Sequence, residues 1–189
     1  MDHYLLLRLV HIVGFITLGG GLLAVFVSEL RAYRTEDVNR FAEAAPGTRR
    51  PFYDGLVLPG AVLVGLSGLL LILELGLGFF TEPWLVGMWG LFLFEVVEGN
   101  TITRVQFQRA LRRSREALAT GRLTAPDREE ARTLLGRITH FLDVPLFLVI
   151  VYCGTMRPDR WAHVLTAIAV ALGAATILTI AVPKLARPR

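Results

Sequence analysis

The chain has 189 residues, of which 53% are hydrophobic, 19% are charged and one is a cysteine, and its mean hydropathy is +0.53. This composition is that of a membrane protein rather than of a soluble domain. The single cysteine excludes a disulfide framework, a CxxC redox pair and an iron–sulfur site built from this chain alone. The net charge of +4 comes with no nucleic-acid-binding motif, which excludes nucleic acid as a partner.

The first apolar stretch covers about residues 4–28, and up to Val27 only Arg8 and His11 interrupt it. At a rise of ~1.5 Å per residue it is long enough to cross the ~30 Å hydrocarbon core of a bilayer. Arginines rather than a small-residue cleavage site follow it, so we expect a span and not a cleaved signal peptide. A histidine in hydrocarbon is costly, which makes His11 a functional-site candidate.

Four further stretches are long enough to span, and they cover about residues 56–80, 84–103, 139–156 and 160–182. Between the third and the fourth, residues 104–137 predict a helical elbow on the cytoplasmic side. Helices satisfy their own backbone groups in lipid, so the prediction is an all-α, polytopic transmembrane helix bundle of five spans, forming a single domain. Of the 20 Lys and Arg residues, 17 lie after the first span, in the elbow or at the C-terminus. The positive-inside rule then predicts an external N-terminus and a cytoplasmic C-terminus, in a multi-pass protein of the cell (inner) membrane.

Two histidines are predicted at similar depths below the outer surface, His11 at ~10 Å in the first span and His163 at ~6 Å in the fifth. Each begins a series of mostly small residues at helical spacing: Gly14, Leu18 and Gly21 after His11, and Thr166, Val170 and Gly173 after His163. Small residues let helices approach closely or leave room for a flat cofactor. Two histidines on different helices are how a bundle holds a b-type haem. The sequence therefore predicts haem b with His11 and His163 as iron ligands, beside Arg8, Gly14 and Thr166.

Two alternatives for these histidines stay open. His11 can bond to Glu74, which ends a comparable series with Gly60 and Ser67 on the second span, and so serve packing alone. His163 lies beside Trp161 near the predicted interface, where a histidine can act as an anchor.

A second polar layer is predicted near the inner surface. Glu95 and Glu98 in the third span, and His140 and Asp143 in the fourth, are each spaced i, i+3, so each pair shares one helix face. Such groups can bind a divalent metal or carry protons. Pairing with arginines at the same level is the competing interpretation. Glu74 and these four residues form the second layer of candidate site residues.

Three segments resemble the CopD/HemJ-like membrane families. They are LLLRLVHIVGFITLGGGLLAVFVSELRAYR, FYDGLVLPGAVLVGLSGLLL and RITHFLDVPLFLVIVYCGTMRP. The basic residue and histidine of the family's first helix correspond to Arg8 and His11, and an Asn-Glu-x-Pro signature corresponds to Leu142–Pro145. The chain is also similar to the predicted integral membrane proteins called DUF2269.

The resemblance implies two different chemistries. HemJ-type proteins are haem-b-associated protoporphyrinogen oxidases with an essential first-helix histidine, whereas CopD-type proteins are linked to copper uptake. The HemJ-type third helix carries a Trp-x-His-x-x-Lys motif, but this chain has Trp84 without the histidine or the lysine. We therefore expect His163 to supply the missing ligand.

The predicted function is haem b binding between helices for electron transfer or membrane redox chemistry, as in a haem-dependent oxidoreductase. A copper or other cation transporter and a structural subunit without cofactor are the alternatives. The expected partners are the lipid bilayer and a quinone or another redox partner, and a homo-oligomer is left open.

Overall fold

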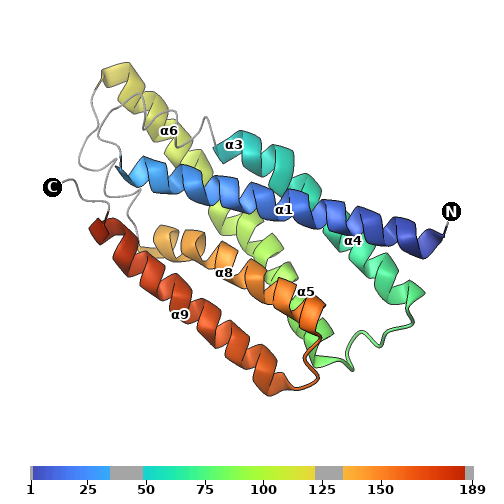
Figure 1. Ribbon diagram of the computed structural model, residues 1–189. Coiled ribbons are helices and arrows are strands. Elements are labelled where there is room, and N and C mark those ends of the chain that lie inside the picture. The colour runs from blue at the N-terminus through green and yellow to red at the C-terminus, as the bar shows by residue number, and fades with distance from the viewer. Residues whose placement is uncertain (1, 35–48, 122–133, 186–189) are drawn as a thin grey trace.

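The computed structural model describes residues 2–34, 49–121 and 134–185, and within these ranges the chain forms helices and no strands. The helices, in chain order, are α1 (His3–Arg34), α3 (Arg49–Phe52), η2 (Tyr53–Val57), α4 (Leu58–Glu74), α5 (Pro83–Glu98), η3 (Gly99–Thr103), α6 (Arg104–Thr120), α8 (Leu134–Met156) and α9 (Trp161–Leu185). Figure 1 shows α1, α4, α5, α8 and α9 running alongside one another as a bundle, with α6 extending past one end.

Four helical segments are long and apolar enough to cross a membrane: His3–Ser28, Tyr53–Glu74, Pro83–Thr103 and Trp161–Val182. A shorter apolar helix, Phe141–Met156, lies between the last two. The all-α, polytopic bundle predicted from the sequence is therefore confirmed. The start of α1 and the end of α9 lie at opposite ends of the bundle, as five crossings require (Figure 1). Which end faces the cytoplasm stays a prediction from the arginines.

The second span is shifted relative to its predicted range. It begins with a π-helical turn at Tyr53 and ends at Glu74, because Gly76 adopts a left-handed conformation with φ of 60°. The Gly76 and Leu77 amides donate to the carbonyls of Leu73 and Ile72, which is the Schellman arrangement. Residues 75–82 therefore link α4 to α5 instead of continuing the helix.

The predicted elbow begins as expected. Helix α6 continues from the third span and ends before Gly121, whose φ of 64° again stops the helix. The second half of the elbow lies largely outside the described residues, which resume at Leu134, where α8 begins.

Helices α1 and α4 pack through glycine. A Cβ added at Gly60 would lie 2.5 Å from the backbone nitrogen of Leu18, and one at Gly14 would lie 2.7 Å from the Cβ of Leu63. Both separations are too short for real contacts, so only glycine permits this approach. The remaining helices meet around fully buried side chains on α5, α8 and α9, among them Leu85, Cys153 and Val164.

Candidate functional site

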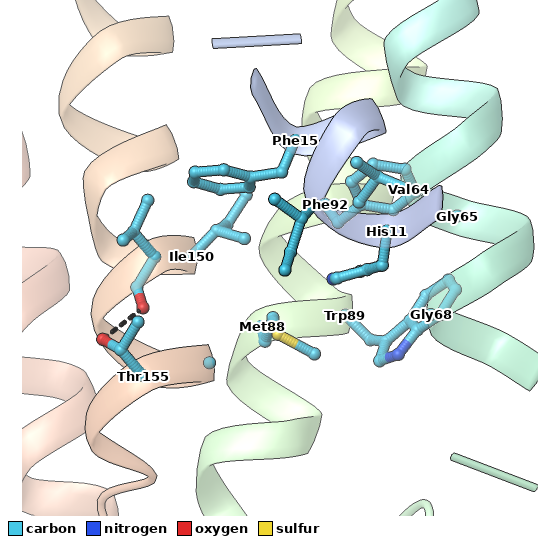
Figure 2. Close-up of a pocket in the computed structure, with 13 residues that line it drawn as sticks. His11, Phe15, Val64, Gly65, Gly68, Met88, Trp89, Phe92, Ile150 and Thr155 are labelled. Atoms are coloured by element: carbon cyan, nitrogen blue, oxygen red, sulfur yellow. Dashed lines mark hydrogen bonds between the residues drawn. The ribbon is translucent and has the colours of Figure 1, made fainter. Parts of the chain in front are cut away.

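A cavity of about 220 Å³ lies between α1, α4, α5 and α8, toward the end of the bundle where α1 begins. Three lining residues come from each of α1, α4 and α5, and four from α8. Almost all of them are apolar, aromatic or glycine, and His11 is the one side chain among them that can carry a charge. Figure 2 shows the His11 ring pointing into this space.

His11 is held by Ser67 of α4. The Nδ1 of His11 lies 3.0 Å from the Ser67 hydroxyl oxygen, and that hydroxyl donates its own hydrogen to the carbonyl of Leu63. Because the hydroxyl hydrogen is already used, we assign the hydrogen between the two side chains to His11 Nδ1. In neutral His11 the lone pair is then on Nε2, the nitrogen left free to bind a metal.

Glycine provides the room for the His11 ring. A Cβ added at Gly68 would lie 3.2 Å from His11 Cε1, which is tighter than most real Cβ contacts. Gly65 and Gly154 also line the cavity, on α4 and α8. The space beside these glycines is taken by neighbouring side chains: Phe92 at Gly65, His11 at Gly68 and the Met88 sulfur at Gly154.

Aromatic rings make up much of the remaining wall. Phe15 of α1 stacks on Phe147 of α8 with their ring centroids 4.9 Å apart, and Trp89 meets Phe92 edge-on at 5.6 Å. The indole N–H of Trp89 is buried and has no hydrogen-bond partner among the described residues. A buried donor of this kind costs ~1–3 kcal/mol when unsatisfied. Trp89 thus lines the cavity, but its unsatisfied N–H is itself buried.

The cavity reaches the outside of the bundle between α1 and α8. Ile12 is 45% exposed and Thr155 is exposed, and both line the cavity. The neighbouring exposed side chains on these helices include Ile16 and Leu148, at 66% and 59%. This exposed side of α1 and α8 is apolar, as expected of a surface that faces acyl chains.

The structure does not bring His163 to the cavity of His11. Val164 of α9 is completely buried and packs against Gly87, where an added Cβ would lie 2.7 Å from the valine side chain. Its neighbours His163 and Thr166 are exposed on the outer side of α9. Of the other predicted haem-site residues, Arg8 is exposed and Gly14 lies in the α1–α4 contact.

The inner polar layer is arranged around Glu98. This side chain is only 7% exposed, and its two carboxylate oxygens accept from the Thr103 hydroxyl at 3.0 and 3.1 Å. Glu95 and Asp143 are partly buried, whereas Glu74 is exposed at the far end of α4. Among the described residues no three His, Cys, Asp or Glu side chains converge on a metal site. The side chain of His140 lies outside the described part of the chain.

The site residues that were not predicted from the sequence include Ser67 as the partner of His11, and Met88 and Trp89 in the cavity wall. The spacing of the glycine contacts between α1 and the second span points to Ser67. Helix α1 runs antiparallel to the second span, with Gly21 against Val57 of η2, and Leu18 and Gly14 against Gly60 and Leu63 of α4. The next step outward along both helices pairs His11 with Ser67. No comparable signal in the sequence marks Met88 or Trp89.

No curated protein and no solved structure matches the chain. The sequence model of one family, described as predicted integral membrane protein (DUF2269), matches residues 5–158, which include α1, α4, α5 and α8 and thus every wall of the cavity. The apolar helices and this match together establish an integral membrane protein, and the chain belongs to the DUF2269 family of predicted integral membrane proteins.

Proposed function

We propose that this protein binds a b-type haem in the His11 cavity, with His11 Nε2 as an axial ligand, and serves electron transfer or redox chemistry in the membrane. The observation that carries the proposal is the Ser67 contact. It holds the imidazole in an apolar cavity and, in the tautomer that we assign, leaves the nitrogen lone pair free. Metal-ligating histidines are typically fixed through the other ring nitrogen in this way.

The apolar lining of the cavity is chemically suited to a flat apolar group. Whether such a group has enough space depends on the cavity volume and on its opening. Its volume of about 220 Å³ is below the ~300–1,000 Å³ typical of cofactor sites. The opening between α1 and α8 leads toward lipid, so a larger apolar group has room to extend in that direction. Aromatic side chains make up much of the lining, which suits the face of a macrocycle.

The residues around the cavity have different roles in holding the ligand. Ser67 orients the imidazole, and Gly68 leaves room for it. The Phe15–Phe147 stack joins α1 to α8 beside the cavity and, with the other apolar lining, keeps water from the ligand. A bound haem would supply one-electron chemistry, which the protein tunes through ligands and surroundings.

The test is a titration of haem-free protein, purified in detergent, with haemin. We expect saturable binding of one haem per chain and an absorption spectrum that sharpens on reduction. A matched titration of empty detergent micelles controls for partitioning. Absorbance that rises without saturation, as it does in empty micelles, would overturn the proposal.

A further inference from the structure

The enclosed volume of the His11 cavity is that of a single substituted ring. The cavity holds about 220 Å³, and an apolar cavity of ~150 Å³ is already large enough to bind benzene. Its lining is mostly apolar, and three of the lining side chains, Phe15, Trp89 and Phe92, are aromatic. Aromatic side chains pack against a further ring edge-on or in offset stacks, so this lining suits an aromatic ligand of one ring.

The His11 ring turns its free nitrogen away from α4. Its Nδ1 lies 3.0 Å from the Ser67 hydroxyl, and a Cβ added at Gly68 would lie 3.2 Å from its Cε1 and 3.5 Å from its Nδ1. The Nδ1–Cε1 edge therefore faces α4, and Figure 2 shows the ring pointing into the cavity. In the tautomer assigned above, Nε2 carries a lone pair and accepts a hydrogen bond.

The other polar side chains of the lining offer a ligand no donor. The Thr155 hydroxyl donates its hydrogen to the carbonyl of Val151 at 2.8 Å, which leaves only lone pairs on its oxygen. The Trp89 N–H has no partner among the described residues, but it is buried and so out of reach from the cavity. A ligand is therefore recognised through a hydrogen that it donates itself.

We propose that the haem-free cavity binds a lipid-soluble phenol of one ring, hydroquinones included, whose hydroxyl donates to His11 Nε2. A ligand without the hydroxyl leaves that acceptor unpaired, which is how such sites reject close analogues. Hydroquinones carry the hydroxyl and quinones do not, so the cavity would distinguish the reduced form of a quinone from the oxidised form. This inference goes beyond the proposed haem function and does not depend on it. A phenol and a haem both need Nε2, so they would compete.

The experiment uses two isomers, 4-propylphenol and 4-ethylanisole, which contain the same atoms but of which only the phenol has a hydroxyl hydrogen. Each is bound to haem-free wild type, His11→Leu and His163→Leu in detergent, and equilibrium dialysis against empty micelles corrects for partitioning. We expect wild type and His163→Leu to bind one phenol per chain, ~10-fold more tightly than the anisole, as one hydrogen bond predicts. His11→Leu should bind the two isomers equally.

Two outcomes would refute the inference. Equal affinities of the isomers in the wild type would show an unselective apolar cavity that an acyl chain fills as well, and this comparison needs no variant to fold. A preference for the phenol that persists in His11→Leu would place the hydroxyl on another acceptor.

A haemin titration of the same wild-type preparation separates this inference from the haem function. Preference for the phenol without haemin binding supports the inference and overturns the haem proposal. Haemin binding without that preference does the reverse. If both ligands bind, 4-propylphenol should weaken the apparent affinity for haemin, and an unchanged affinity would contradict a shared Nε2.

Discussion

Helices α1 and α9 each carry a histidine followed by small residues at helical spacing, yet they use these series in opposite ways. On α1, Gly14 packs against α4 and Gly21 against η2, and His11 faces a cavity. On α9, a Cβ added at Gly173 would meet no atom within 4 Å, and His163 is exposed. The inward side of α9 is formed by Val164, Ala171 and Ala175. A series of small residues thus defines a face of a helix, and the partner helix decides whether that face is buried.

Apart from removing a histidine, we expect the largest difference in haem affinity between variants of α1's site and of α9 when Ser67, the partner of His11, is replaced. Ser67→Ala removes the contact that orients the ring, and losing such a supporting contact weakens metal binding by ~10–100-fold. Thr166→Ala, beside His163, should leave haem affinity unchanged. Haemin titrations of both variants measure this. Equal affinities in the two variants would contradict the role given to Ser67.

A smaller effect is expected from the glycines. Gly60→Ala places a Cβ 2.5 Å from the backbone of Leu18 and should cost ~1–3 kcal/mol of stability, as overpacking does. Gly173→Ala meets open space and should be neutral or stabilise α9, because alanine favours helix by ~1 kcal/mol over glycine. Thermal unfolding of the haem-free variants in detergent compares them. A Gly60→Ala protein as stable as Gly173→Ala would show that α1 and α4 do not pack as described.

The smallest effect is expected at the aromatic contact beside the cavity. Phe147→Leu breaks the stack with Phe15, and such a pair contributes ~0.5–1.5 kcal/mol beyond its buried area. Phe94→Leu, on an exposed part of α5, provides the matched control and should change stability by less than ~0.5 kcal/mol. The same unfolding assay detects a difference of a few degrees between them. If Phe147→Leu and Phe94→Leu unfold at the same midpoint, the stack of Phe15 and Phe147 does not stabilise the fold.

The sequence predicts the fold well because a long apolar run in a membrane protein forms a spanning helix and has few alternatives. Its helix ends are less certain, since Leu75–Phe80 is as apolar as the span before it and only Gly76 marks the stop. His11 is found because a polar residue stands out among apolar ones. His163 stands out equally, and depth along the chain says nothing about rotation around the helix axis. That rotation is decided by side chains such as Val164, which contact a helix far away in the sequence.

The partner of His11 illustrates the same limit. Glu74 and Ser67 lie on one face of α4, and charge alone favours the carboxylate. The glycine contacts fix the register of α1 on α4, and in that register the serine meets the imidazole whereas Glu74 stays exposed. Backbone packing therefore decides which polar residue completes the site.

The most direct test of the account is the visible spectrum of haemin-loaded wild type beside His11→Ala and His163→Ala. We predict that the wild type and His163→Ala give the same spectrum, and that His11→Ala loses it and partly regains it with added imidazole. Loss of the spectrum in His163→Ala, with His11→Ala unchanged, would contradict the account and place the ligand on α9.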